Sequence, residues 1–289
     1  MYSGSIVALA TPFKNFQVDY NAVRHLVQWH IEKGTKAIVA CGSTGEAMFL
    51  SDQERAEILR VCRETAAGKL PIIMGCGGAA TDVTVGMAQA AKQGDADALL
   101  VVTPYYVKPK DAGIIEHYRQ IAEVGVPIIL YNNPGRTVAD MSVDLICKIA
   151  ETPGVIGLKD SNTDLCRVVQ LRKQLGSDFA LLSGDDPVAL GYMAYGGDGC
   201  ISVAANIVPD LCQGLMDAWF ARDFDTVAKL RDRLQPLYQT LFIESNPTPL
   251  KYAMKLMGLC NGELRLPLVE VSGESARVIE NQLRELNLV

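Results

Sequence analysis

The sequence has few of the side chains that bind metals, and it has no run of basic residues. Only three histidines occur among 289 residues, and the eight cysteines are scattered, with no Cys-x-x-Cys pair and no group of cysteine with histidine. This pattern argues against a zinc site and against a disulfide framework, so we expect the cysteines to be buried free thiols. Lysine and arginine number 27 against 33 acidic residues, and the net charge of −6 argues against nucleic acid as a partner.

Long apolar runs are absent as well. No stretch approaches the roughly 18 apolar residues that a membrane-spanning helix needs. The first residues, MYSGSIVALATPF, lack the basic region and the long apolar core of a secretion signal. We therefore expect a cytoplasmic protein that does not bind membranes. Hydrophobic residues make up 49% of the chain, which is enough for a substantial globular core.

The sequence does contain a regular alternation of short apolar runs and helical patterns. The runs are rich in valine, isoleucine and leucine and lack the alternation of a half-exposed strand, which indicates strands buried on both faces of a parallel sheet. They lie at residues 5–10, 36–41, 71–75, 98–102, 127–131, 155–159, 179–183 and 199–203. Between two of them, Ser51 followed by Glu54 predicts a helix start with a capping box, and Gly68 predicts the end of that helix.

Eight strand-then-helix units predict an α/β fold, a closed (β/α)8 or TIM barrel. A doubly wound open sheet is the alternative, but the Gly-x-Gly-x-x-Gly loop expected after its first strand is absent. Helical segments follow the last strand at residues 207–220, 224–242, 247–258 and 271–286. Because this exceeds what a barrel needs, we assign residues 1–223 to the barrel and residues 224–289 to a C-terminal helical extension.

In a TIM barrel the chemistry lies where strands end and the following loops begin, and Lys159 ends the apolar run VIGLK. A lysine is rarely buried without a partner, and loss of water around its ammonium group favours the neutral, nucleophilic amine. Such an amine forms a Schiff base with a keto acid. The alternative is a solvated lysine that points sideways from the strand end.

Three further groups follow other strands and suit such a reaction. The segment GSTGE places Ser43 and Thr44 in a glycine-flanked turn whose N–H and hydroxyl groups can bind a carboxylate, although such turns also occur without function. Tyr131 ends its strand with a phenol that can move protons, or it is an ordinary core tyrosine. Arg136 can bind a second carboxylate, or it is a surface arginine.

Tyr105 and Tyr106 follow the fourth predicted strand. Adjacent side chains in an extended segment point in opposite directions, so at most one of the two is expected to face a pocket.

Taken together and in this order, the segments GSIVALATPF, GSTGE, VVTPYY, YNNPGRT, GLKD, LSGDD, GDGCISV and FIESNPTPLKYAM resemble the dihydrodipicolinate synthase / N-acetylneuraminate lyase family of Schiff-base lyases. The resemblance runs nearly from end to end of the chain. The arginine of YNNPGRT, the tyrosine pair and ESNPTPLK are closer to the synthases of this family than to its sialic acid lyases.

The resemblance implies that Lys159 condenses with pyruvate and that the resulting enamine attacks the aldehyde of L-aspartate 4-semialdehyde. The product would be 4-hydroxy-tetrahydrodipicolinate, a precursor in lysine and diaminopimelate biosynthesis. It also implies that Tyr131 relays protons through Ser43 to Tyr106 of a neighbouring subunit.

The same resemblance implies the substrate contacts. Thr44 and Ser43 would bind the pyruvate carboxylate, the Ile201 backbone and Gly184 would lie near the keto acid, and Arg136 would bind the carboxylate of the semialdehyde. No metal or organic cofactor is implied, and the family habit is a homotetramer of two tight dimers.

Three features depart from the synthase pattern, namely GSTGE in place of GTTGE, KDSNTD after the lysine, and Asn133 in place of an apolar residue. They leave open an aldolase or dehydratase that acts on another hydroxylated 2-oxo acid. A third reading is a barrel that binds a keto acid while its lysine stays inert.

The feedback site that binds lysine in many synthases is also changed. Only Tyr105 is kept, and the other matching positions hold Ala47, Met48, Asp52, Arg55, Ala79 and Val83. Nothing here holds the amino group of the effector, so we expect weak or absent inhibition by lysine.

Overall fold

A computed structural model describes residues 2–289 and contains all eight expected strands. They are β1 (Gly4–Ala8), β4 (Ala37–Ala40), β5 (Ile72–Cys76), β6 (Ala98–Val102), β7 (Ile128–Asn132), β8 (Val155–Asp160), β9 (Ala180–Ser183) and β10 (Gly199–Ser202). They form a closed barrel in the order β1-β10-β9-β8-β7-β6-β5-β4, with parallel pairing. The predicted TIM barrel is confirmed.

The chain divides into two compact units, one containing Pro71–Ile201 and the other containing Gly4–Leu70 and Ser202–Val289. The predicted boundary after residue 223 separates the barrel from the C-terminal helices and does not coincide with these units. It stays a prediction.

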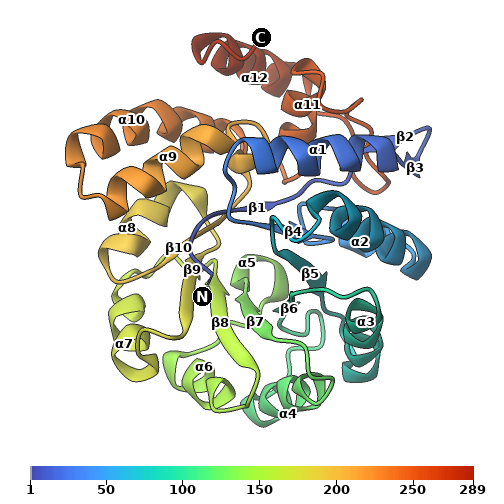
Figure 1. Ribbon diagram of the computed structural model, residues 1–289, viewed down its shortest axis with the longest axis vertical. Coiled ribbons are helices and arrows are strands. Elements are labelled where there is room, and N and C mark those ends of the chain that lie inside the picture. The colour runs from blue at the N-terminus through green and yellow to red at the C-terminus, as the bar shows by residue number, and fades with distance from the viewer. Residues whose placement is uncertain (1) are drawn as a thin grey trace. The chain divides into compact units, whose positions relative to one another are not determined.

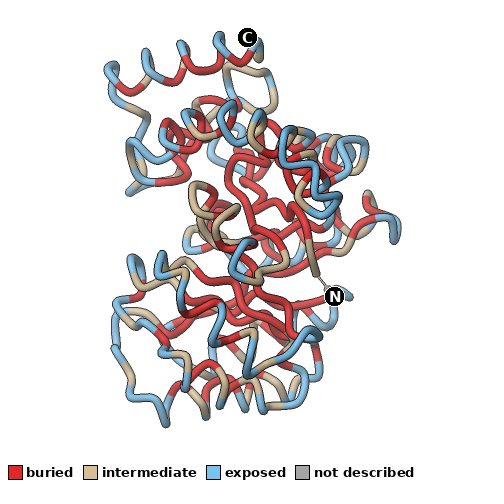
Figure 2. The backbone as a smooth tube through the Cα atoms, turned by 90° about the vertical axis from the view of Figure 1, so that its left-hand side faces the viewer, coloured by how far each residue is buried: buried red, intermediate tan, exposed pale blue. Residues whose placement is uncertain are grey.

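In the unit containing Pro71–Ile201, five helices lie along the outer side of the strands (Figure 1). They are α3 (Thr81–Gln93), α4 (Asp111–Ala122), α6 (Val143–Ala150), α7 (Cys166–Leu175) and α8 (Ala189–Ala194). The short α5 (Pro134–Thr137) directly follows β7 and lies inside this ring of helices (Figure 1). The strands are buried along almost their whole length, whereas the helices alternate between buried and exposed turns (Figure 2). This confirms that the strands are covered on both faces.

The other unit holds the remaining helices and a small hairpin. The helices are α1 (Tyr20–Glu32), α2 (Asp52–Ala66), α9 (Pro209–Phe220), α10 (Phe224–Thr240), α11 (Thr248–Leu256) and α12 (Gly273–Glu285), and the hairpin is β2 (Phe13–Lys14) with β3 (Gln17–Val18). The capping box is confirmed, because Ser51 and Glu54 each bond the backbone N–H of the other. The hairpin was not predicted, since two-residue strands leave no periodic pattern.

The cysteines are free, and five of the eight are buried. Cys147 and Cys260 are partly exposed, and Cys166 is exposed, so the expectation of buried thiols is wrong for these three. Cys166 lies in the first turn of α7, where its side chain faces solvent.

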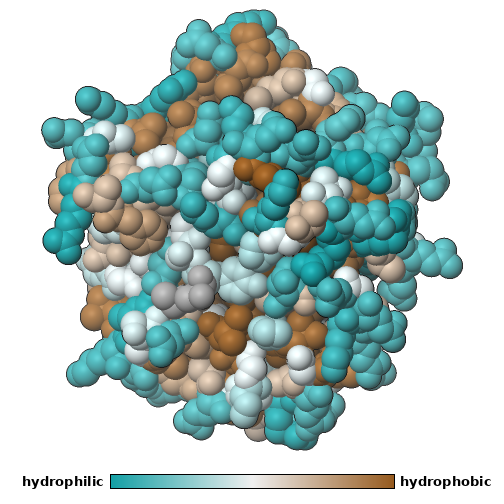
Figure 3. Space-filling model, in the orientation of Figure 1, coloured by the Kyte–Doolittle hydropathy of each residue, from teal (hydrophilic) through white to brown (hydrophobic). Residues whose placement is uncertain are grey.

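The face of the molecule drawn in Figure 3 is mainly hydrophilic, with smaller apolar areas between the polar ones. Among residues 2–289, every helix is too short or too polar to cross a membrane.

Two of the three histidines are buried and hydrogen-bonded to threonines. His30 Nδ1 lies 2.9 Å from Thr35 Oγ1, and His117 Nδ1 lies 3.0 Å from Thr81 Oγ1. Burial lowers the pKa of His30 to about 3 and that of His117 to about 4. Within the described residues, histidine, cysteine and acidic side chains form no group of three that could hold a metal ion.

We predict that these two histidines make the fold sensitive to acid. The unfolded chain binds protons at both positions below about pH 6.5, whereas the folded chain does so only near pH 4 and 3. Their contribution is therefore complete above pH 6.5 and is lost as the pH falls, by up to about 1.4 kcal/mol per pH unit for each histidine. Denaturant unfolding at pH 7, 6 and 5 measures this loss. The free energy of unfolding should fall less steeply with decreasing pH in His30→Gln and in His117→Gln than in the wild type.

His25→Gln is the matched control, because His25 is exposed on the same helix as His30. An unchanged slope in the variants of the two buried histidines would contradict the prediction.

Candidate active site

Strands β7 and β8 bring Tyr131 and Lys159 together. The register between these strands shifts at Ile128 and Ile129, after which Tyr131 stands directly opposite Lys159. Directly opposed residues point to the same face of a sheet, so both side chains project to one side. The Lys159 Nζ lies 4.3 Å from the centroid of the Tyr131 ring.

Both side chains are almost fully buried, with Lys159 and Tyr131 each 6% exposed. The alternative of a solvated lysine therefore does not describe Lys159. An amine with so little surrounding water is suited to nucleophilic attack on a carbonyl carbon.

The hydroxyl of Tyr131 is held by polar groups from two loops. Asn133 Nδ2 donates a hydrogen bond of 2.7 Å to Tyr131 Oη, and the Ser161 hydroxyl bonds the same group. Burial raises the pKa of the Tyr131 phenol, but the charge of Lys159 and the two hydrogen bonds oppose it. With a smaller contribution from Arg136, they hold this pKa below its ordinary value.

Gly184 leaves the space that Lys159 and Ser161 need. A Cβ at position 184 would lie 2.2 Å from Ser161 Oγ and 3.0 Å from Lys159 Cε. The backbone of Gly184 also takes part, because its N–H donates to Asp160 O at 2.7 Å and its carbonyl oxygen lies 3.3 Å from Ser161 Oγ. Any side chain here would displace the hydroxyl of Ser161 or the stem of Lys159.

A polar network behind this pair fixes the ends of the two strands. Asn132 Nδ2 donates to Asp160 Oδ1 at 2.9 Å and to Asp140 Oδ1 at 2.8 Å, and Arg167 lies 3.2 Å from the same oxygen of Asp140. Burial raises the pKa of Asp160, although Arg167 and Asn132 oppose the shift. Because Asn132 and Asp160 directly follow Tyr131 and Lys159, the network holds the backbone of both site residues.

The other predicted site residues of this unit differ in how far they are buried. Ile201 is buried in β10, and Arg136 is exposed on α5, within electrostatic range of Tyr131. Tyr105 is half-buried, whereas Tyr106 is 95% exposed and has a left-handed backbone with φ of 70°. The Tyr106 side chain thus faces solvent in the single chain and is accessible to another molecule.

The GSTGE segment follows β4 in the other unit. Ser43 is half-buried, and the buried Thr44 accepts a hydrogen bond of 3.0 Å at Oγ1 from Asn246 Nδ2. A hydroxyl that accepts from an amide directs its own hydrogen elsewhere, so the Thr44 O–H is free to donate to an anion.

A buried ion pair anchors the end of that segment. Glu46 has a left-handed backbone with φ of 54°, which is unfavourable for a residue other than glycine. Its carboxylate accepts from Lys251 Nζ at 2.6 Å and from the backbone N–H of Arg265 at 3.1 Å. Lys251 also donates to Thr11 O at 2.9 Å, so α11 holds both the first strand's loop and the GSTGE loop.

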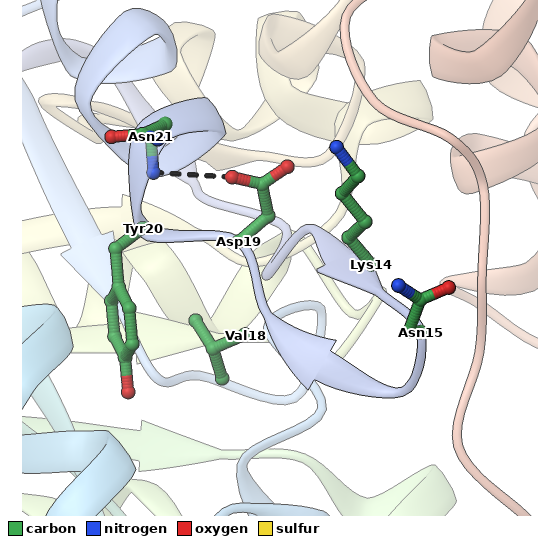
Figure 4. Close-up of a pocket in the computed structure, with 6 residues that line it drawn as sticks. All are labelled: Lys14, Asn15, Val18, Asp19, Tyr20 and Asn21. Atoms are coloured by element: carbon green, nitrogen blue, oxygen red, sulfur yellow. Dashed lines mark hydrogen bonds between the residues drawn. The ribbon is translucent and has the colours of Figure 1, made fainter.

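A surface pocket of about 390 Å³ lies elsewhere, at the start of α1 (Figure 4). It is lined by Lys14, Asn15, Val18, Asp19, Tyr20 and Asn21. The carboxylate of Asp19 is already used to cap α1, accepting from the N–H groups of Asn21 and Ala22. None of the predicted site residues lines this pocket, so we do not take it as the active site.

The profile of the Dihydrodipicolinate synthetase family matches residues 1–286. The chain belongs to this family. It is 43% identical over 290 residues to a 4-hydroxy-tetrahydrodipicolinate synthase of Parvibaculum lavamentivorans and 44% identical over 289 residues to one of Bradyrhizobium diazoefficiens. These matches cover 100% of this chain and 100% and 98% of the relatives, respectively.

Solved structures of dihydrodipicolinate synthases have the same fold. The enzyme of Aquifex aeolicus superposes with a TM-score of 0.97 at 41% identity, covering 99% of each chain. The chloride-inhibited synthase of Acinetobacter baumannii, solved in complex with pyruvate, superposes with a TM-score of 0.97 at 40% identity over 100% of each chain.

Sequence analysis of this family member missed several residues that the structure places around the expected ones. Asn133 and Ser161 were noted only as departures from the synthase pattern, and Lys251 and Glu46 only as letters of longer motifs. A lysine inside an otherwise apolar helix face, as in TPLKYAM, was the available signal for a buried charge that needs a partner.

We predict that Lys251→Ala lowers the free energy of unfolding by about 3–5 kcal/mol, because it leaves the carboxylate of Glu46 buried without its cation. Lys33→Ala is the control, since Lys33 pairs with Asp210 at 3.3 Å on the surface and is expected to cost at most about 1 kcal/mol. Urea unfolding followed by circular dichroism measures both. Equal losses of unfolding free energy in the two variants would contradict the prediction that the buried pair stabilises the fold more than a surface pair.

Proposed function

We propose that the protein is a 4-hydroxy-tetrahydrodipicolinate synthase, a Schiff-base lyase that condenses pyruvate with L-aspartate 4-semialdehyde. The observation that carries the proposal is the buried amine of Lys159 beside the ring of Tyr131. The names of the full-length relatives support it, as does the pyruvate complex of the Acinetobacter baumannii enzyme.

In the first half of the reaction, the neutral amine of Lys159 attacks the ketone carbon of pyruvate, and the carbonyl oxygen takes up a proton. Loss of the resulting hydroxyl as water gives an iminium ion, and loss of a methyl proton then gives the enamine. Tyr131 Oη, which is held by the amide of Asn133, accepts and returns the protons as the carbinolamine forms and breaks down.

In the second half, the enamine carbon attacks the aldehyde carbon of the semialdehyde, and the new alkoxide is protonated to the hydroxyl group. The amino group of the former semialdehyde then attacks the iminium carbon and displaces Lys159, which closes the ring and frees the enzyme. The sum of the steps consumes one pyruvate and one semialdehyde and releases one water.

The remaining predicted residues enter this proposal with defined roles. Ser43 and Thr44 bind the pyruvate carboxylate, and Arg136 binds the carboxylate of the semialdehyde. The closed strand order supports these roles, because the loops after parallel barrel strands all open at the same end of a barrel.

Two backbone positions complete the substrate site. Ile201 offers its backbone to the keto acid, and Gly184 contributes its own backbone beside the stem of Lys159.

The assembly and its surroundings follow from the same proposal. Tyr106 of a neighbouring subunit completes a proton relay with Ser43 and Tyr131, which its 95% exposure in the single chain supports. We propose a homotetramer of two tight dimers, in the cytoplasm, that uses no metal or organic cofactor.

A second candidate function is cleavage or dehydration of another hydroxylated 2-oxo acid by the same amine. The amide of Asn133 and the hydroxyl of Ser161 favour it, because both lie beside the reacting pair and can bond substrate hydroxyl groups. A barrel that binds a keto acid without catalysis is disfavoured by the burial of Lys159.

We predict that borohydride traps a pyruvate adduct on Lys159 of the wild-type protein and that Lys159→Ala abolishes both the adduct and turnover. Peptide mass analysis locates the adduct, and Lys148→Ala is the control, since Lys148 is exposed on α6. Tyr131→Phe should lower turnover about 10²–10⁴-fold. Turnover with pyruvate and the semialdehyde, compared with a panel of 2-oxo-acid aldols, separates the two candidate functions, and an adduct without any turnover would exclude both.

We also predict that millimolar L-lysine leaves the initial rate nearly unchanged, because the positions that would hold the effector carry Ala47, Ala79 and Val83. The synthase of Cyanidioschyzon merolae, 32% identical, has been solved with lysine bound and serves as a comparison protein. Strong partial inhibition at sub-millimolar lysine would overturn this prediction.

A further inference from the structure

The hydroxyl of Tyr131 is bonded by two side chains that no strand of the barrel contributes. Asn133 lies just after β7, and Ser161 just after β8, so the two loops approach the phenol oxygen separately. The Asn133 amide nitrogen lies 2.7 Å from Tyr131 Oη, which is a short bond for a neutral amide donor.

Asn133 occupies a position where asparagine usually serves another purpose. It is the N-cap residue of α5, and asparagine is among the preferred N-cap residues because its side chain bonds the free N–H groups of the first turn. Here the side chain makes no capping bond and turns to Tyr131 Oη instead. Helix capping therefore does not account for this residue.

Ser161 reaches the phenol only because position 184 has no side chain. Its Oγ lies 3.3 Å from Gly184 O and 2.2 Å from where a Cβ of residue 184 would stand. The Ser161 backbone continues the β7–β8 pairing by donating to Asn132 O at 2.9 Å, so the hydroxyl is fixed on the same framework as Lys159.

We propose that Asn133 and Ser161 are positioning residues for the reaction, which hold the Tyr131 oxygen from two sides and keep it as a hydrogen-bond acceptor next to the Lys159 amine. The inference rests on the proposed Schiff-base chemistry at Lys159, but not on the identity of the second substrate.

The chemistry follows from the number of bonds that a phenol oxygen can accept. It has two lone pairs, and two donors occupy them more strongly when the oxygen carries a negative charge. The charged groups that act on the phenol are Lys159 on β8 and Arg136 on α5, and both lower its pKa, which favours the negatively charged phenolate. Tyr131 is thereby prepared to take a proton when the amine of Lys159 adds to the ketone.

The test uses pyruvate alone, so that the second substrate plays no part. The rate of adduct formation, trapped by borohydride, is measured against pH in the wild type, Asn133→Leu and Ser161→Ala. Each substitution removes one donor and should move the acid limb of the profile to higher pH by about one unit.

Conservative variants separate positioning from simple structural support. Ser161→Thr keeps the hydroxyl and should restore the wild-type profile. Asn133→Asp keeps the shape of the side chain but replaces the donor by a negative acceptor, so it should shift the limb further than Asn133→Leu. A structural role would leave the Asp variant close to the wild type.

The decisive comparison is in the background of Tyr131→Phe, where the oxygen is absent. Asn133→Leu and Ser161→Ala should then leave the pH profile and the rate unchanged, because groups that act through one atom are not additive. A shift of the same size with and without Tyr131 would overturn the proposal. A wild-type protein that forms no pyruvate adduct would instead refute the proposed function.

Discussion

The register between β7 and β8 is the constraint on which the candidate site depends. Ile128 pairs with Val155, but Ile129 pairs with Gly157, so one extra residue enters β8 at this point. Without that shift Tyr131 would stand opposite Leu158, and its ring would point to the opposite face from Lys159. The irregularity is therefore what places a phenol over an amine. Gly157, which lies at the shift, also allows β9 to approach closely, because a Cβ there would lie 2.9 Å from the carbonyl oxygen of Ala180 on β9.

Burial makes this contact chemically useful. Lys159 and Tyr131 lose almost all of their water, and the groups that remain around the phenol oxygen are donors and cations. In such surroundings each hydrogen bond is electrostatically stronger than it is in water. The polar network of Asn132, Asp160 and Asp140 lies behind the pair and restrains the backbone at the ends of β7 and β8.

The sequence predicted the barrel and the strand ends because the signals are local. A run such as VIGLK is short, apolar and bounded by turns, and the residue that ends it is visible without any structure. The register shift is not local, since it depends on how two strands 27 residues apart align, and this alignment decided that Tyr131 meets Lys159. The bonds from Asn133 and Ser161 were also out of reach, because loop side chains have several rotamers and only packing selects one.

The ion pair between Glu46 and Lys251 has a consequence for how this chain can be shortened or recombined. Lys251 lies on α11, beyond residue 223, yet its ammonium neutralises a carboxylate in the loop after β4 and bonds the carbonyl of Thr11. A barrel cut free of its last helices would keep an isolated negative charge in its interior, with the GSTGE turn attached to it. Grafting the barrel onto another C-terminus thus requires a replacement cation, or the joint removal of both charges.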